Sequence, residues 1–259
     1  MALTLLFAAV SGGLTALTVL GGVSPWWILP LWLGYYAAVA LTGIVLLILA
    51  LYLFLPAGNP SPRMRRFNHR IVRSVLAWLT VMVGTRIKVQ GAYKLPDAPY
   101  LLVGNHRSAF DPLCSLVVFP DDTVFVAKPS VLRIPILGSV LGRMGFLGID
   151  RDNARNAVAT IKRAAELIRD VGLCVGIYPE GTRSKDGNLL PLHAGSFKIA
   201  KLANCPVAVV SVRVKKWGLF PHYVELRVVD VMDADYVAES NTAAMSERAE
   251  QVLRTDLGL

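Results

Sequence analysis

The feature that most constrains this chain is its first 62 residues, which contain no aspartate, glutamate, lysine, arginine or histidine. Two apolar runs, residues 3–20 and 26–55, are separated there by a short turn with glycine and proline. A helix of about 20 residues crosses a hydrocarbon core of about 30 Å. We therefore expect residues 1–62 to form a membrane anchor of two apolar helices, which cross the bilayer or dip into one leaflet. A signal peptide is disfavoured, because no basic residue precedes the first run and a second run follows it.

The first charges form a cluster of arginines directly after the anchor: Arg63, Arg65, Arg66, Arg70 and Arg73. The positive-inside rule places such a cluster on the cytoplasmic side. Apolar side chains are interleaved with it, namely Ile71, Val72, Val75, Leu76, Trp78 and Leu79. We expect residues 63–84 to be a basic amphipathic helix at the membrane interface, with its arginines near anionic headgroups. The alternative is a solvated helix on the domain that follows.

Residues 85–259 alternate between short β-rich runs and helical runs. The predicted strands are 86–89, 100–103, 123–127, 174–178, 207–214 and 223–229, and the predicted helices are 153–171, 196–202 and 242–253. Strands that alternate with helices indicate an α/β domain, here a mixed and mostly parallel sheet flanked by helices.

The chain has a net charge of +9, which suits an anionic partner. The apolar N-terminus makes the lipid bilayer the simplest such partner. Nucleic acid is not expected, because the sequence has no zinc-finger spacing and no RNA-recognition pattern. Cys114, Cys174 and Cys205 are far apart and form no CxxC motif, so we expect neither a disulfide framework nor a metal site.

The segment NHRSAFD, residues 105–111, begins where the apolar run 100–104 ends. Open α/β sheets usually carry their sites at strand ends. If the turn folds back, the Asp111 carboxylate holds one nitrogen of His106 and makes the other more basic, which suits removal of a proton from a substrate hydroxyl. From the spacing alone an alternative stays open, in which Asp111 caps a helix that continues with Pro112 and His106 is a turn residue.

A second polar segment, YPEGTRS at residues 178–184, also follows a predicted strand. Arg183 is a natural phosphate ligand because its planar guanidinium matches phosphate oxygens, and Glu180 would position Arg183 or a substrate hydroxyl. Arg151, at the end of GFLGIDR (145–151), and Lys128, at the end of a predicted strand, are further candidate cations for the same anion. The alternatives are a surface Glu–Arg pair, a solvated Lys128, and Asp150 or Asp152 as a helix cap.

Four blocks in the order NHRSAFD, GFLGIDR, YPEGTRS and CPVAVV (205–210) resemble those of the glycerolipid acyltransferase family, specifically its 1-acylglycerol-3-phosphate acyltransferases. The resemblance implies that His106 and Asp111 are the catalytic pair. It also implies a site for the substrate phosphate made of Glu180, Gly181, Thr182, Arg183, Arg151 and Lys128. The implied reaction moves a fatty acyl group from acyl-CoA or acyl-acyl carrier protein to the sn-2 hydroxyl of 1-acylglycerol 3-phosphate, giving phosphatidic acid in phospholipid biosynthesis. It needs no metal and no cofactor.

Together these features predict an organisation with an anchor at 1–62, an interfacial helix at 63–84 and an α/β domain at 85–259 on the cytoplasmic face of a membrane. The resemblance, which covers about residues 84–215, implies that this last domain is an acyltransferase. Two other functions stay open. One is acylation of a different lyso-lipid acceptor. The other is a non-catalytic membrane protein that binds anionic lipid through the arginines of residues 63–73.

Overall fold

The computed structural model of the protein describes residues 2–54, 62–119, 122–150, 153–184, 188–217 and 220–259. Its N-terminal helices are α1 Ala2–Leu20, α2 Ile28–Phe54 and α3 Pro62–Met82. The strands are β1 Arg86–Gln90, β2 Leu101–Gly104, β3 Thr123–Ala127, β4 Leu147–Gly148, β5 Cys174–Ile177, β6 Val207–Trp217 and β7 Phe220–Met232. The remaining helices are α4 Asp111–Val118, α5 Pro129–Leu132, α6 Leu137–Met144, α7 Ala154–Arg169, α8 Lys198–Ala203, α9 Ala234–Glu239 and α10 Thr242–Leu257.

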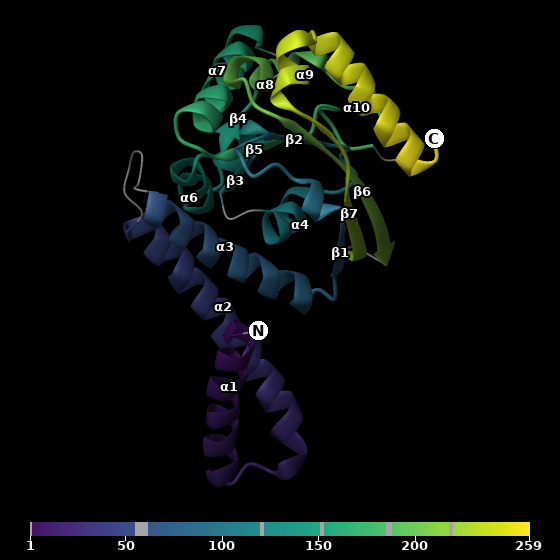
Figure 1. The fold of residues 1–259 in the computed structure, drawn as a ribbon. Helices are drawn as coiled ribbons and strands as arrows, with labels where there is room; N and C mark the ends of the chain where they lie inside the picture. The colour runs from purple at the N-terminus through teal and green to yellow at the C-terminus, as the bar shows by residue number, and fades with distance from the viewer. Residues whose placement is uncertain (1, 55–61, 120–121, 151–152, 185–187, 218–219) are drawn as a thin grey trace.

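The strands form one seven-stranded sheet in the order β1-β7-β6-β2-β5-β3-β4. Neighbouring strands are parallel except β6 and β7, which are antiparallel. Helices α7, α8 and α10 lie on one side of the sheet, and α4 with α3 lies on the other (Figure 1). This arrangement confirms the predicted mixed, mostly parallel sheet flanked by helices. It places β2, which precedes His106, at the centre of the sheet, buried along its whole length.

Helices α1 and α2 form an antiparallel hairpin that projects from the rest of the molecule (Figure 1). Residues Ile28–Ala50 of α2 are long and apolar enough to cross a bilayer, whereas the apolar part of α1, Thr4–Leu20, is shorter. Large apolar side chains point outward along the hairpin, including Leu17 at 69% and Trp26 at 90% exposure. The structure thus confirms the predicted pair of apolar helices, and their exposed apolar surface is of the kind that mediates membrane association.

Helix α3 differs from its predicted role in one respect. Five of the six apolar residues expected to face the bilayer are buried or half-buried against the protein, and Leu79 is the exposed one. Trp78 lies edge-on to Phe7 of α1, and its indole N–H donates to the Tyr36 hydroxyl of α2 at 3.1 Å. Helix α3 therefore packs between the hairpin and the α/β domain, as the alternative of a helix on that domain implied. A role at the membrane interface stays a prediction.

Two arginines fasten these layers together. Arg73 on α3 donates through Nε to the carbonyl of Val117 on α4 at 2.7 Å. Arg143 on α6 donates to the carbonyl of Tyr52 near the end of α2 at 2.6 Å, and its guanidinium lies 5.0 Å from the centre of the Tyr52 ring. Arg73, expected near lipid headgroups, is thus bound within the protein.

Local signals account for the ends of several elements. Asn153 caps α7, because its side chain accepts from the amide of Asn156, so the interpretation of Asp150 or Asp152 as the cap is wrong.

All three cysteines are buried and free, as expected from their spacing. Burial raises the pKa of the Cys114 thiol to about 12, so this thiol stays protonated at neutral pH.

Candidate active site

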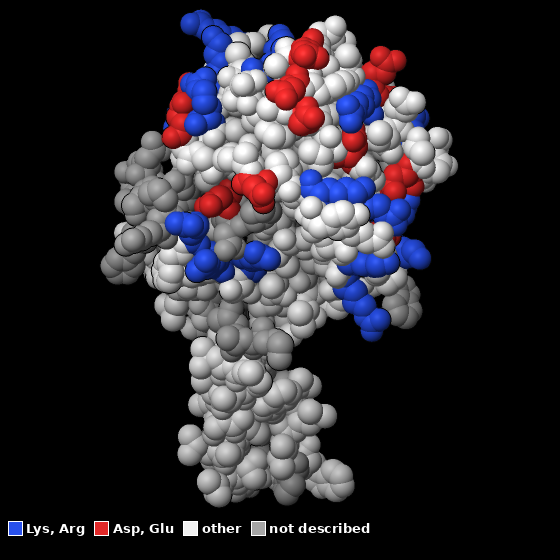
Figure 2. All heavy atoms as spheres, in the orientation of Figure 1, with Lys and Arg blue, Asp and Glu red and all other residues white. Residues whose placement is uncertain are grey.

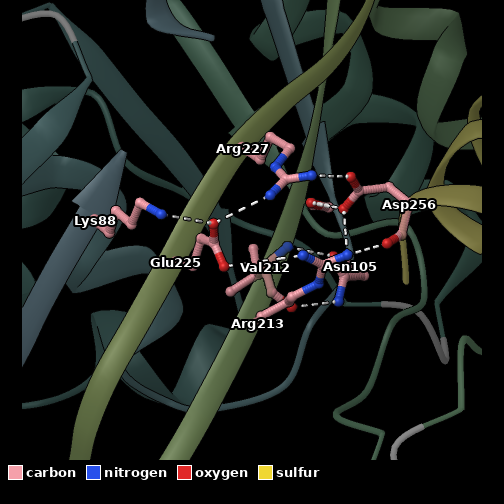
Figure 3. A network of polar contacts seen from close by, with 8 residues as sticks. Lys88, Asn105, Val212, Arg213, Glu225, Arg227 and Asp256 are labelled. Atoms are coloured by element: carbon pink, nitrogen blue, oxygen red, sulfur yellow. Dashed lines mark hydrogen bonds and ion pairs between the residues drawn. The ribbon is translucent and has the colours of Figure 1, made fainter. Parts of the chain in front are cut away.

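The candidate site begins at the end of β2, where Asn105 holds the chain against β6. Its side-chain amide donates to the carbonyl of Val212 at 2.9 Å, and its side-chain oxygen accepts from the amide of Val212 at 2.7 Å. Figure 3 shows this pair beside the charged side chains of β6 and β7. Asn105 is buried, so the side chain takes the place of a missing sheet residue and fixes the point where His106 leaves the sheet.

The turn after β2 folds back as the catalytic hypothesis required. His106 Nδ1 lies 2.9 Å from Asp111 Oδ2, and the same oxygen accepts from the backbone amides of Arg107 at 2.6 Å and Ser108 at 2.7 Å. The interpretation of Asp111 as a helix cap is wrong, because α4 begins at Asp111 with Phe110 in the cap position. The carboxylate instead serves the turn that precedes the helix.

Burial and hydrogen bonding set the chemistry of this pair. Asp111 is completely buried, whereas the His106 side chain is 20% exposed. An ionised carboxylate only accepts hydrogen bonds, so it holds the proton of neutral His106 on Nδ1 and leaves Nε2 as an unprotonated base. The arrangement orients an imidazole to take a proton at Nε2 and stabilises the imidazolium that results.

An aromatic stack supports the imidazole from one side. The ring of His106 lies 4.6 Å from that of Tyr178 and nearly parallel to it, and Tyr178 in turn stacks on Phe125 at 5.7 Å. The Tyr178 hydroxyl lies 3.2 Å from Ser115 Oγ, and burial raises the pKa of this phenol well above its usual value. Tyr178 is therefore a neutral packing residue that restricts the tilt of His106.

Glu180 is placed differently from its predicted role as a substrate ligand. It is 4% exposed, its Oε1 accepts from the backbone amide of His106 at 2.5 Å and its Oε2 accepts from that of Leu190 at 3.0 Å. Burial raises the pKa of this carboxyl, and the two amide bonds oppose that shift. Glu180 thus joins the His106 turn to the segment after residue 188. Sequence reasoning missed Leu190, because a backbone donor leaves no trace in side-chain identity.

The remaining candidate ligands lie in exposed positions near the same sheet edge. Gly181, Thr182 and Arg183 are exposed in the loop after β5, and Lys128 is exposed directly after β3. Because β2, β5 and β3 are adjacent and parallel, their carboxyl ends meet at one edge. The amide of Ser184 donates to the carbonyl of His106 at 3.0 Å, which ties this loop to the turn. Arg151 lies outside the described residues.

The fold and site together define an α/β domain with a histidine–carboxylate pair at the end of its central strand. Residues 86–213 match the profile of the family described as Acyltransferase, and this match spans all four sequence blocks. Residues 86–213 therefore form a domain of this acyltransferase family.

Similar proteins include several named 1-acyl-sn-glycerol-3-phosphate acyltransferase. The chain is 33% identical over 141 residues to the mouse 1-acyl-sn-glycerol-3-phosphate acyltransferase alpha, covering 54% of this chain and 50% of the mouse protein. It is 34% identical over 136 residues to the 1-acyl-sn-glycerol-3-phosphate acyltransferase of Borreliella burgdorferi, covering 52% of this chain and 54% of that protein. The chain thus spans about half the length of these curated relatives.

The fold is shared with a solved structure. The crystal structure of the 1-acyl-sn-glycerophosphate acyltransferase from Thermotoga maritima superposes with a TM-score of 0.66 at 20% identity, covering 82% of this chain and 86% of that one. At this identity the similarity concerns the fold alone, and it extends beyond the α/β sheet because it includes most of the chain.

Proposed function

We propose that this protein transfers a fatty acyl group from a thioester donor, acyl-CoA or acyl-acyl carrier protein, to the sn-2 hydroxyl of 1-acylglycerol 3-phosphate. The product is phosphatidic acid, a precursor in phospholipid biosynthesis. The observation that carries the proposal is the 2.9 Å contact between His106 Nδ1 and buried Asp111, which prepares Nε2 as a base. The names of the relatives support the acceptor.

In this reaction His106 Nε2 takes the proton of the acceptor hydroxyl as its oxygen attacks the thioester carbonyl. The tetrahedral intermediate then expels the thiolate, which takes the proton from the imidazolium, so the base is restored. Asp111 stays ionised and stabilises the imidazolium. A thioester is already activated, so the mechanism includes no acyl-enzyme and no metal.

The acceptor phosphate is assigned to the cations at the β3–β5 side of the site. Arg183 would bind phosphate oxygens with its planar guanidinium, and Lys128 would add a second positive charge. Thr182, Gly181 and Arg151 complete the proposed set. Glu180 contributes through the His106 turn, because both of its oxygens accept backbone amides.

The α1–α2 hairpin is assigned to the bilayer that holds the acceptor, with the α/β domain on the cytoplasmic face. Its support is the apolar, exposed surface of the hairpin and the arginines that follow it. Docking there would let a lipid hydroxyl reach His106 without complete extraction from the membrane.

The test is an acyl-transfer assay on the purified full-length protein in detergent. One labelled acyl-CoA is offered with 1-acylglycerol 3-phosphate and with a panel of other lyso-lipids. His106→Ala should lower the rate by about 10²- to 10⁴-fold, the usual contribution of a general base. His193→Ala, which removes an exposed histidine, is the matched control.

The panel also separates the alternatives. Turnover only with another lyso-lipid would show that the acceptor is a different lipid and would leave the proposed mechanism unchanged. Lipid binding without turnover for any acceptor, with acyl-CoA and in a repeat with acyl-acyl carrier protein, would indicate a non-catalytic protein. Near-normal activity of His106→Ala would refute the assigned base.

A further inference from the structure

A cationic groove lies beside strands β1, β7 and β6, which are on the other side of β2 in the strand order from β5 and β3 of the proposed phosphate ligands. It has a volume of about 760 Å³ and is lined by Arg86, Arg107, Arg213, Lys215, His222 and Glu225, among others. Four arginine or lysine side chains thus face one carboxylate. Lysine and arginine side chains gather on the side of the molecule where β6 and β7 lie (Figure 2).

The sheet register shows how these charges are arranged. Arg86 of β1 and Lys215 of β6 both lie opposite Tyr223 of the intervening strand β7, so the three form one row across the sheet. The next row is Lys88, Glu225 and Arg213. Side chains one residue apart along a strand point to opposite faces of the sheet, and side chains two residues apart point to the same face. The residues of these two rows are two apart along each strand. Both rows therefore lie on the same face.

The two carboxylates of this region form ion pairs with the cations of the second row and with Arg227, which lies two residues further along β7. Glu225 lies 3.8 Å from Lys88, 3.9 Å from Arg213 and 3.2 Å from Arg227. Asp256 of α10 pairs with Arg213 at 3.1 Å and with Arg227 at 2.9 Å (Figure 3). The first row instead places two exposed cations on either side of a tyrosine, with Lys215 Nζ 5.9 Å from the centre of the Tyr223 ring.

This pattern fits an extended anion better than a single phosphate. Neighbouring strands are about 4.8 Å apart, so the backbones of Arg86 and Lys215 are separated by about 10 Å. Two phosphate groups at the ends of a nucleotide match that spacing, and the tyrosine ring between them offers a surface on which a base stacks. A concave, partly apolar groove also suits a small molecule more than a protein surface.

The position of the groove suggests which substrate it serves. Arg107 lines the groove and directly follows His106, whereas Lys128 and Arg183 come from β3 and the loop after β5, on the other side of β2 in the strand order. Two substrates must meet at His106. Resting on the proposed function, we infer that the groove binds the phosphorylated adenosine part of a CoA donor through Arg86, Lys215 and Arg107, with Tyr223 against the adenine.

Calorimetric titration of the full-length protein in detergent with CoA that carries no acyl chain tests this inference without requiring turnover. The double variant Arg86→Gln/Lys215→Gln should raise the Kd for CoA by about tenfold or more, since two charge-assisted contacts are lost. It should raise the KM for acyl-CoA similarly and leave the KM for 1-acylglycerol 3-phosphate unchanged. Both side chains are exposed, so the thermal unfolding of the variant should match that of wild type.

Lys88→Gln is the matched control, because it removes an exposed cation of the same strand that belongs to the row of Glu225. It should change the Kd for CoA by less than about twofold, as expected for an exposed ion pair. An unchanged Kd for CoA in the double variant would overturn the inference. So would a raised KM for the lipid acceptor alone, which would indicate a headgroup site, or a raised KM only for acyl-acyl carrier protein.

The failure of the inference is distinguishable from that of the proposed function. CoA binding that depends on Arg86 and Lys215, without acyl transfer to any lyso-lipid, would refute the function and support the groove. Normal transfer to 1-acylglycerol 3-phosphate with donor kinetics unchanged in the double variant would support the function and refute the groove.

Discussion

Replacing Glu180 with glutamine distinguishes two roles for this carboxylate, contact with substrate and support of the His106 turn. Glutamine keeps the shape of the side chain but converts one acceptor oxygen into an NH₂ donor. The oxygens of Glu180 accept from the amides of His106 and Leu190, so one of these amides would face a donor. Because Glu180 is 4% exposed, water does not replace the lost acceptor.

The expected cost follows from these contacts. Glutamine leaves one buried backbone amide without an acceptor, which costs about 1–3 kcal/mol, so we expect a net destabilisation of about 2 kcal/mol. For a chain of this size that lowers Tm by about 4–8 °C. Glu166→Gln is the matched control, because Glu166 is an exposed partner of Arg163 and its loss should cost less than about 0.5 kcal/mol.

The difference should depend on pH with a defined sign. Burial raises the pKa of Glu180 above its ordinary value of 4.5, so the folded protein holds this proton more tightly than the unfolded chain. The stability that wild type gains from that proton is present below the unfolded pKa and is lost as the pH rises through the folded pKa. Glutamine does not titrate, so its destabilisation relative to wild type should be largest in acid and narrow as the pH rises.

Thermal unfolding and steady-state acyl transfer, both on the full-length protein in detergent, complete the test. A positioning residue acts through His106, so Glu180→Gln should lower kcat by about 10- to 100-fold, the effect of a small misplacement of a catalytic group. The KM for the lipid acceptor should not change. An unchanged Tm together with a raised acceptor KM would refute this reasoning and restore Glu180 as a substrate ligand.

Three further changes probe the same architecture. Asp111→Asn keeps the turn but removes the charge that stabilises the His106 imidazolium, so kcat should fall by about 10²- to 10⁴-fold at unchanged KM; a loss below threefold would contradict the pairing. Gly176→Ala places a Cβ 2.2 Å from the Phe125 ring, beneath the aromatic stack, and should cost about 1–3 kcal/mol in denaturant unfolding while lowering kcat; wild-type kinetics would show that the stack does not orient the base. Asp256→Asn weakens the attachment of α10 to β6 and β7 and should lower stability by about 1–2 kcal/mol without changing acceptor KM, as thermal unfolding and kinetics would show.

Most of the sheet was predictable because its strands are apolar and well separated by turns. The elements that were missed are short: β4 has two residues, and α5, α9 and α6 have four, six and eight, too few for periodicity to show. Strands β6 and β7 are longer than predicted. They pair with each other over nearly their whole length, including the part of β6 that lies beyond its pairing with β2. Helix α10 continues to Leu257, past its last predicted residue, and Asp256 in that extension binds Ser211 and Arg227.

The candidate site was predictable in its local part. The five-residue spacing of His106 and Asp111 allowed the observed pair, but it also allowed a helix cap. Only the three-dimensional structure shows that the amides of Arg107 and Ser108 donate to the same oxygen of Asp111. The role of Glu180 depends on the backbone amide of Leu190, ten residues later, and on that of His106, in the connection after β2. No sequence spacing rule predicts contacts of this kind. The apolar side of α3 likewise gave no sign of whether lipid or protein would cover it.

The attachment of the hairpin has a practical consequence for work with this protein. A fragment that began at residue 63 would remove the Tyr52 carbonyl from Arg143 and the rings of Phe7 and Tyr36 from Trp78. The newly bared indole and its neighbours on α3 would form an apolar patch of the kind that drives aggregation. Removing the N-terminus to obtain an enzyme that needs no detergent should therefore give an aggregation-prone, less stable protein. Polar substitutions on the outward side of the hairpin would leave the contacts of Tyr52, Phe7 and Tyr36 intact.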